Sequence, residues 1–410
     1  GLYDKPYLLR KFSEMLSNRR IFQVITVNLY QINHINKVTG VDGGDRLILS
    51  AARQLHRLCG DNVFRISGKR FLIFTFSQEQ FELYLDELEN LFHPDTAPSG
   101  TAVSSPVIIS GIFHAEQFED GGSILDYAQY LESLAPNTGF YETVRDTDKT
   151  MERFLYLKKV EQYLHTAITN DLFEVYYQPV YSLKEKRYIT LEALSRLYHP
   201  ELGWVPPDLF IQIAEKNNLV DKITILQFRR ICRFIQEHPL LTDRLCNIKM
   251  NLSPLDLIQT NSSTHLIRLM DEYGVKHSFI QFEITETVAT EYNSALNKAV
   301  DDFADSGIGL CLDDFGSGYA NLNTVMQLPF SAIKLDRSLL SKICEDPRSA
   351  NFYHSIVSSF QNMGFHVISE GVETDAEVKL LSDYGVDMIQ GFYFSKPLPP
   401  EKLLDLLEKS

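Results

Sequence analysis

The sequence predicts an α/β protein in which residues 149–410 form a barrel or a doubly wound sheet of repeated strand and helix units. Two observations predict this fold class. Seven short apolar runs end in polar or acidic residues, at 188–194, 247–252, 279–285, 309–314, 332–336, 366–370 and 388–392. Between them lie segments with apolar residues at three- and four-residue steps, most clearly at 207–216, 295–306 and 375–384. We expect these segments to pack as helices outside the strands.

The sequence pattern of residues 1–148 predicts a separate domain of mixed α/β type. A β-rich run at 21–27 precedes a helical segment from Asp45 to about Cys59. Strands at 62–66 and 71–76 flank the turn 67–70 and predict a hairpin. A strand at 107–113, a helix at 122–133 and a charged helical segment at 146–170 follow. We place the domain junction at the start of this last segment.

The composition is that of a globular protein that does not bind nucleic acid. Hydrophobic residues make up 44% of the chain and charged residues 23%. The 54 acids outnumber the 39 lysines and arginines, which gives a net charge of −15, and no long basic run is present. An acidic protein that handles a polyanion therefore needs metal ions or local arginines to offset its own field.

The cysteines and the apolar runs indicate a reducing compartment. The five cysteines are scattered and odd in number, which does not suit a disulfide framework. No run of 18 apolar residues and no signal peptide is visible. We expect a cytoplasmic chain without a membrane segment or, since the sequence begins at Gly1, the cytoplasmic part of a larger sensor or membrane protein.

Polar residues at the ends of the apolar runs predict a metal site. They are Glu192, Asn251, Glu283, Asp313, Asp314, Asp336 and Glu370. In a barrel the carboxyl ends of the strands converge on one mouth, so these side chains would become neighbours. Carboxylate and amide oxygens suit Mg²⁺ or Mn²⁺. Two such ions could activate a water molecule and stabilise the leaving oxygen of a phosphodiester.

Each of these residues also has a simpler interpretation. An acid at a strand end is often a helix cap or a solvated loop residue. Lys334 could be a surface lysine whose aliphatic chain passes along the core while its ammonium group stays in water. The metal hypothesis therefore depends on all seven residues taken together. Six of the seven polar strand ends are acids, and helix capping alone does not explain so many.

Residues from about 153 to 410 resemble the EAL family of cyclic di-GMP phosphodiesterases. The family's motifs appear in order as Glu192-Ala193-Leu194, Asn251-Leu252-Ser253, Glu283-Ile284-Thr285-Glu286, Asp313-Asp314-Phe315-Gly316, Lys334-Leu335-Asp336, Glu370-Gly371-Val372-Glu373 and Gln390-Gly391-Phe392. The resemblance implies a modified TIM barrel that hydrolyses cyclic di-GMP to linear pGpG with two Mg²⁺ or Mn²⁺ ions.

The resemblance also implies roles for single residues. The metal ligands would be Glu192, Asn251, Glu283, Asp313, Asp314 and Glu370. Lys334 would orient the attacking water, and Gln390 would complete the water network. Substrate contacts would come from Gln178, Leu194 and Arg196. Glu286 would fix the loop after Asp314, and Asp336 and Glu373 would support the ligands.

Residues up to about 148 resemble a degenerate GGDEF domain, the diguanylate cyclase fold. The hairpin that should carry the naming motif reads Ser67-Gly68-Lys69-Arg70-Phe71, and Asn28 stands where the family has a metal-binding Asp. Cyclase activity is therefore not expected. Asn36 and Asp45 match guanine contacts, although Asp45 could simply cap the following helix. The functional interpretation is a regulatory domain that binds GTP without turnover, with Lys69 and Arg70 at the phosphates.

Two other functions stay open at this point. A catalytically silent receptor would bind cyclic di-GMP and signal through contacts. A phosphodiesterase for another dinucleotide would share the metal site. The family resemblance also implies a homodimer.

Overall fold

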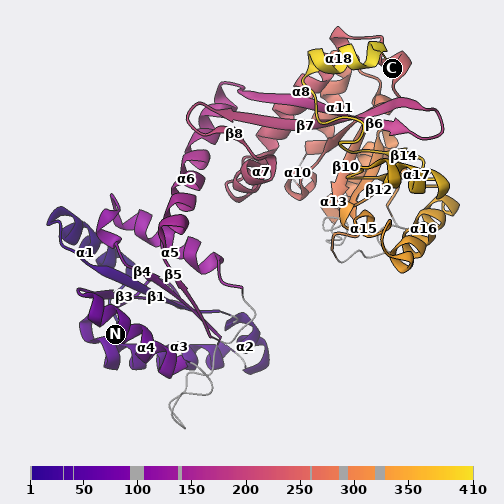
Figure 1. Ribbon diagram of the computed structural model, residues 1–410. Helices are drawn as coiled ribbons and strands as arrows, with labels where there is room; N and C mark the ends of the chain where they lie inside the picture. Colours follow the sequence, from indigo (N-terminus) through magenta and orange to yellow (C-terminus); the bar gives the residue numbers. More distant parts are fainter. Residues whose placement is uncertain are drawn as a thin grey trace. The chain divides into compact units, whose positions relative to one another are not determined.

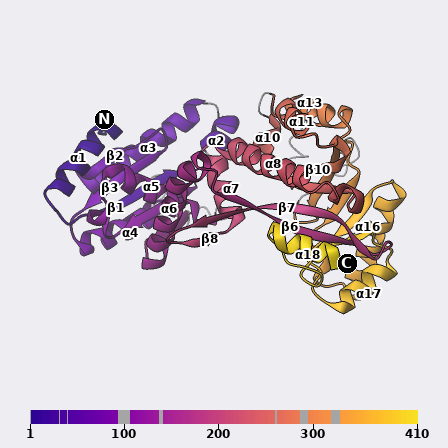
Figure 2. The same ribbon diagram turned by 90° about the horizontal axis from the view of Figure 1, so that it is seen from above.

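The computed structural model describes residues 2–30, 32–39, 41–92, 106–136, 141–258, 261–285, 294–318 and 328–409. The chain divides into two compact units, Gly1–Lys158 and Lys159–Ser410, and the division falls within helix α6 (Asp148–Thr169). Each unit has its own sheet and its own apolar core (Figures 1 and 2). Within these ranges no helix is both long and apolar enough to span a bilayer.

The first unit is a five-stranded sheet with helices on both faces. Its strand order is β2 (Val63–Arg65), β3 (Arg70–Thr75), β1 (Gln23–Leu29), β4 (Val107–Ile112) and β5 (Tyr141–Arg145). One face packs on α1 (Lys5–Ser17) and α5 (Gly121–Ser133), and the other on α3 (Val41–Cys59) and α4 (Gln78–Phe92). The remaining elements are α2 (Ile32–Thr39), η1 (Gly60–Asn62) and η2 (Ala115–Gln117). Strand β1 is buried along its whole length because both faces are covered.

The predicted hairpin is confirmed, and one predicted helix boundary is wrong. Strands β2 and β3 pair antiparallel around the turn. Helix α3 begins at Val41, so Asp45 lies inside it and does not cap it. Gly44 lies in the first turns of this helix, and a Cβ there would lie 2.1 Å from Oδ1 of Asn36.

The second unit is a closed barrel of eight strands. Around the ring they are β6 (Phe173–Ser182), β14 (Met388–Ile389), β13 (His366–Ser369), β12 (Ala332–Leu335), β11 (Gly309–Phe315), β10 (Ile280–Thr285), β9 (Asn247–Asn251) and β7 (Arg187–His199). Strand β6 is antiparallel to both its neighbours, and the other pairs in the ring are parallel. The short strand β8 (Gly203–Val205) extends β7 outside the ring.

All seven predicted strand runs occur in this ring, and β6 is the strand that the pattern did not predict. Because β6 pairs with both β14 and β7, it closes the sheet. The barrel is therefore confirmed, and the doubly wound alternative is excluded.

Helices surround the barrel in both views (Figures 1 and 2). They are α7 (Pro207–Lys216), α8 (Val220–Glu237), α9 (Leu241–Arg244), α10 (Pro254–Ile258), α11 (Ser262–Tyr273), η3 (His277–Phe279), α13 (Ser294–Asp305), α15 (Arg337–Leu340), α16 (Pro347–Asn362), α17 (Asp375–Asp383) and α18 (Pro400–Lys409). The three predicted helices correspond to α7, α13 and α17.

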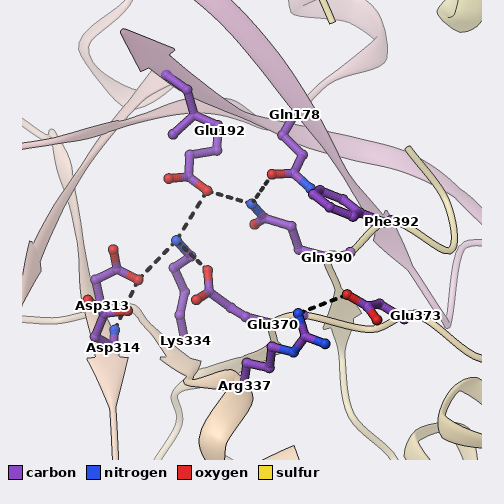
Figure 3. A pocket seen from close by; sticks show the side chains of 13 residues that line it. Gln178, Glu192, Asp313, Asp314, Lys334, Arg337, Glu370, Glu373, Gln390 and Phe392 are labelled. Carbon is purple, nitrogen blue, oxygen red and sulfur yellow. Dashed lines mark hydrogen bonds and ion pairs between the residues drawn. The ribbon is translucent and has the colours of Figure 1, made fainter. Parts of the chain in front are cut away.

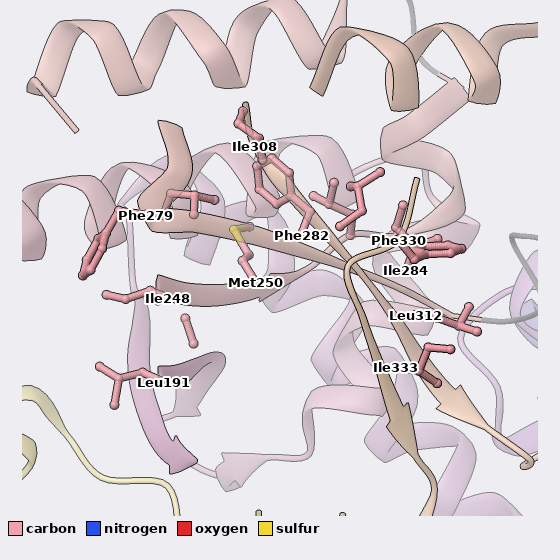
Figure 4. Packing of buried hydrophobic residues seen from close by; sticks show 14 of the residues in the cluster. Leu191, Ile248, Met250, Phe279, Phe282, Ile284, Ile308, Leu312, Phe330 and Ile333 are labelled. Atoms are coloured by element: carbon pink, nitrogen blue, oxygen red, sulfur yellow. The ribbon is translucent and has the colours of Figure 1, made fainter. Parts of the chain in front are cut away.

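Alternation along each strand separates the apolar core from the polar interior of the barrel. The outward side chains, among them Ile248, Met250, Phe282, Ile284 and Leu312, pack in one cluster (Figure 4). Successive side chains of a strand point to opposite faces. The residues between these apolar ones therefore face the barrel interior, and they include most of the predicted site.

Candidate metal and active site

A cavity of about 320 Å³ opens at the carboxyl ends of the barrel strands. Figure 3 shows its lining, which consists of Gln178, Glu192, Leu194, Asp313, Asp314, Lys334, Arg337, Glu370, Gly371, Glu373, Gln390, Gly391 and Phe392. Most of these residues come from the ends of β11, β12, β13 and β14 or from the segments that follow them, and the others come from the middle of β6 and β7. The ring geometry thus brings together residues from distant parts of the chain.

Lys334 lies at the centre of this group. Its side chain is almost fully buried, and its Nζ contacts four carboxylates. The distances are 2.6 Å to Glu370, 2.9 Å to Asp313, 3.2 Å to Glu283 and 3.3 Å to Glu192. Four carboxylates from four strands or strand ends therefore converge on a single point. These four predicted ligands therefore form one carboxylate cluster around Lys334.

The carboxylates outnumber the positive charge that faces them. Burial raises the pKa of Glu370 to about 8, with further increases from Asp313 and Glu192, and Lys334 opposes this shift. Burial also raises the pKa of Asp314 to about 6, with neighbouring Asp313 adding to it. The pKa of the buried Glu283 lies well above its ordinary value for the same reasons. The cluster is short of positive charge, which is the electrostatic signature of a cation site.

Glu192 differs from these acids because it has more partners. Burial raises its pKa, but Lys334 and hydrogen bonds from Gln390 and Asn251 hold the pKa below its ordinary value. Asn251 Nδ2 donates to Glu192 Oε1 at 2.8 Å, and Gln390 Nε2 donates to Oε2 at 2.5 Å. Glu192 is therefore the acid most firmly held as a carboxylate.

A second feature of a metal site is the local backbone at Asp313 and Asp314. Oxygens of Asp313, Asp314 and Glu370 lie within 4.8 Å of one another, as expected for groups that could share an ion. Asp314 has a φ of 56°, a left-handed conformation that is costly for a residue with a side chain. Its backbone N–H donates to Asp313 Oδ1 at 3.0 Å. The strained backbone thus holds two adjacent carboxylates beside the cavity.

These residues fit hard divalent cations. Their donors are carboxylate oxygens and one amide, which Mg²⁺ and Mn²⁺ prefer. The buried Oε1 of Glu283 has no hydrogen-bond partner in the described part of the chain, and the ammonium group of Lys249 lies 3.7 Å from it. The sequence prediction of a shared oxygen-rich cluster is therefore matched by the geometry.

Of the three predicted substrate contacts, two reach the cavity. Gln178 accepts a hydrogen bond from Gln390 Nε2 at 3.2 Å, and Leu194 lines the wall. Arg196 lies outside the described lining of the cavity. Its guanidinium donates to the carbonyl of Ser195 at 2.9 Å and lies 5.5 Å from the ring of Tyr176.

The remaining predicted positions have different environments. Asp336 accepts a hydrogen bond from the N–H of Ser338 at 2.9 Å and caps α15, so the simpler interpretation holds for this strand-end acid. Glu373 lines the cavity and pairs with Arg337 at 2.8 Å. Glu286 lies outside the described residues.

The sequence analysis missed Arg337 and Phe392 in the lining. Arg337 directly follows Asp336, and Phe392 ends the last predicted apolar run. Their positions after two strand ends could have signalled both, because such positions surround the mouth of a barrel.

In the first unit, a buried acid that the sequence analysis did not consider faces the hairpin of β2 and β3. Glu132 of α5 pairs with Arg70 at 2.9 Å and accepts from Asn28 Nδ2 at 3.0 Å and from Thr26 Oγ1 at 3.4 Å. Burial raises the pKa of Glu132, and Arg70 opposes that shift. Arg70 is thus engaged inside the protein.

The predicted nucleotide contacts of the first unit lie near one another. Asn36 on α2 is half-buried, and its Oδ1 lies beside Gly44. Asp45 follows Gly44 and is exposed.

The fold and the site together define an α/β barrel protein with a carboxylate cluster suited to divalent metal ions. The model of the EAL domain family matches residues 161–397, more than half of the chain. The chain belongs to the EAL domain family. The match lies within the second unit.

Curated relatives and solved structures agree with this assignment. The chain is 25% identical over 415 residues to the cyclic di-GMP phosphodiesterase NbdA of Pseudomonas aeruginosa, covering 99% of this chain and 53% of NbdA. It is 34% identical over 239 residues to the cyclic di-GMP phosphodiesterase RocR of the same species, covering 58% of this chain and 61% of RocR. The chain therefore spans little more than half the length of these relatives.

One solved structure resembles the second unit in particular. The PaMucR phosphodiesterase in complex with c-di-GMP has a TM-score of 0.56 and 28% identity. The match covers 60% of this chain and 99% of that structure.

Proposed function

We propose that the barrel hydrolyses one phosphodiester bond of cyclic di-GMP and gives linear pGpG, with two Mg²⁺ or Mn²⁺ ions. The observation that carries the proposal is the convergence of four carboxylates on Lys334 beside an open cavity. The names of NbdA, RocR and PaMucR support cyclic di-GMP as the substrate.

Six residues would hold the ions, namely Glu192, Asn251, Glu283, Asp313, Asp314 and Glu370. When bound, the ions would supply an activated water molecule and stabilise the leaving oxygen. Asp313, Asp314 and Glu370 would hold an ion together, because their oxygens lie within 4.8 Å of one another.

The chain's own residues prepare the site for an anionic substrate. Lys334 provides a buried positive charge at the floor of the cavity, where it offsets negative charge that develops on the phosphodiester. Gln390 donates to both Glu192 and Gln178, so it fixes the wall against which the substrate would lie. Arg196 would have to turn toward the cavity to reach a phosphate, leaving its present bond to Ser195.

Product analysis tests this function. The purified chain is incubated with cyclic di-GMP and Mn²⁺ or Mg²⁺, and the products are separated by chromatography. We expect pGpG from the wild-type chain and none from Glu192→Ala. Binding of cyclic di-GMP without any pGpG would contradict the proposal and identify a receptor. A panel with other cyclic dinucleotides measures selectivity, and a faster reaction with one of them would overturn the substrate assignment.

We further propose that the first unit is a GGDEF-like regulatory domain without cyclase activity, in a cytoplasmic homodimer. Asn36 and Asp45 would contact the guanine of GTP. The ion pair between Arg70 and Glu132 limits how the hairpin would bind phosphate. It occupies the guanidinium group of Arg70, which would otherwise be free to contact a phosphate. Of the two hairpin bases, only Lys69 therefore remains as a phosphate contact.

Calorimetry with the full chain tests the GTP proposal. GTP is titrated with and without Mg²⁺ in the absence of cyclic di-GMP. We expect binding that Asp45→Asn weakens. Absence of heat at millimolar GTP would end the proposal. Sedimentation of the same sample would show a dimer, and a monomer at micromolar concentration would contradict that part.

A further inference from the structure

A second lysine lies inside the barrel, below the carboxylate cluster. Lys249 stands on β9 between Ile248 and Met250, which point outward into the apolar core (Figure 4). Its side chain is 1% exposed. It lines a cavity of about 460 Å³ at the amino-terminal ends of the strands, together with Ile189, Ala332 and Met388. Lys249 thus lies between the two ends of the barrel.

Lys249 has few partners for a buried charge. Its Nζ makes no hydrogen bond within the described ranges. A buried ammonium group that makes no hydrogen bond is destabilising, so an apolar side chain would be the more stable choice at this position. Packing alone therefore does not account for a lysine here.

Lys249 has Glu283 as its ion-pair partner. Glu283 Oε1 lies 3.7 Å from its Nζ, and the other oxygen of Glu283 contacts Lys334 at 3.2 Å. Lys249 pairs in register with Gln281, two residues before Glu283 on the neighbouring strand. Since both side chains face inward, Lys249 lies one layer below Glu283. Glu283 is therefore held between two lysines, one below it and one beside the substrate cavity.

The two lysines are not equivalent partners. Lys334 is shared among four carboxylates, whereas the one carboxylate in ion-pair range of Lys249 among the described residues is Glu283. Glu283 does not line the substrate cavity, and neither does Lys249. Lys249 can therefore act on the site only through the orientation of Glu283.

We propose that Lys249 is a positioning residue that fixes Glu283 from inside the barrel for metal binding. This inference rests on the proposed function of the cluster. Residues that orient a metal ligand from behind change metal affinity by about 10- to 100-fold when they are replaced. Without Lys249, Glu283 has only the shared Lys334 as an ion-pair partner, and its carboxylate is free to turn toward it.

Metal titration of three forms of the full chain tests this role. The wild-type chain, Lys249→Met and Lys249→Arg are stripped of metal and titrated with Mn²⁺ by calorimetry. Met fills a similar volume without a charge, whereas Arg keeps the positive charge and is long enough to reach Glu283 Oε1. We expect Lys249→Met to weaken Mn²⁺ binding about tenfold. Lys249→Arg should recover most of the loss. Lys402→Met, an exposed lysine on α18, serves as the matched control.

Turnover of cyclic di-GMP gives a second measurement. At saturating Mn²⁺ we expect Lys249→Met to lower kcat with little change in KM, since the residue does not reach the substrate cavity. Unchanged Mn²⁺ affinity and kcat in a cooperatively folding Lys249→Met would overturn the inference. Equal losses in the Met and Arg variants would also overturn it, because the ion pair with Glu283 should survive in Arg. If the wild-type chain made no pGpG, the proposed function would fail, while the Mn²⁺ titration would still decide the role of Lys249.

Discussion

The two units of the chain each bury acids against a basic side chain, but the balance of charge differs. In the first unit, Glu132 faces Arg70 and accepts from the neutral side chains of Asn28 and Thr26. One negative charge meets one positive charge there. In the second unit, Lys334 alone contacts four carboxylates. Several negative charges there have no fixed counter-charge.

The first unit therefore has a structural contact whose charges balance, whereas the second unit has a site that can accept a cation. A buried ion pair whose charges balance has no need of an added ion. A carboxylate cluster with raised pKa values is stabilised when a cation enters. One of the two hairpin bases of the first unit is thus held in an internal ion pair, whereas the second unit has the charge deficit that metal binding requires.

The largest expected effect is the loss of a central carboxylate. Asp313→Asn removes a charge from the group that lies within 4.8 Å of Asp314 and Glu370. We expect turnover of cyclic di-GMP to fall more than about a hundredfold, since loss of a ligand exceeds the loss of its support. The kcat is measured at several Mn²⁺ concentrations. Asp383→Asn, an exposed acid on α17, is the control. Wild-type turnover in Asp313→Asn would contradict the assignment of the cluster.

Replacing the lysine at the centre of the carboxylate cluster should slow the chemical step. Lys334→Met removes the charge that faces the cavity floor. We expect kcat to fall about 10²-fold and KM to change much less, because charge develops on the phosphodiester mainly in the transition state. Steady-state kinetics separate the two constants, and the exposed Lys342→Met is the control. A change confined to KM would show that Lys334 serves substrate binding instead.

The balanced pair of the first unit should affect stability. Glu132→Ala leaves the partly buried Arg70 without its partner, and we expect the free energy of unfolding to fall by about 2 kcal/mol. Glu132→Gln should cost less, because its amide oxygen still accepts hydrogen bonds from Arg70 or Asn28. Urea unfolding followed by far-UV circular dichroism measures both. Equal stability of the Ala variant and the wild type would mean that the ion pair contributes nothing.

The smallest expected effect is a release of protons when metal binds. In the metal-free chain the raised pKa of about 8 keeps Glu370 mostly protonated at pH 7. A bound cation requires the carboxylate, so binding must displace the proton. The release should be largest below pH 8 and should decline as the pH rises above it, where Glu370 is already ionised. Calorimetry in buffers of different ionisation enthalpy measures it. Metal binding at pH 7 without proton release would show that the cluster is not short of positive charge.

The strands of the barrel could be predicted because each carries a local signal. Runs such as 279–285 and 309–314 alternate or concentrate apolar residues in a way that a buried strand requires, and they correspond to β10 and β11. Strand β6 was missed for the opposite reason. It contains Pro179 and several tyrosines, and it is antiparallel to both neighbours, so it does not repeat the pattern of the other strands.

The sequence predicts that acids gather at the candidate site but not which groups each of them contacts. Their place at strand ends is visible in the sequence, and the barrel gathers them for a general geometric reason. That Asp336 would cap a helix while Asp313 joined the cluster was not visible, since both are acids at a strand end.

The sequence by itself determined the repeated strand and helix units, the oxygen-rich set of side chains and the two bases of the hairpin, Lys69 and Arg70. These properties depend on residue type and short-range spacing. Only the tertiary structure decided that Lys334 contacts four carboxylates, that Lys249 lies beneath Glu283 and that Arg70 pairs with Glu132. Such contacts join residues far apart in the chain, and they arise from the closure of the ring and from helices packing on a sheet, which no local pattern encodes.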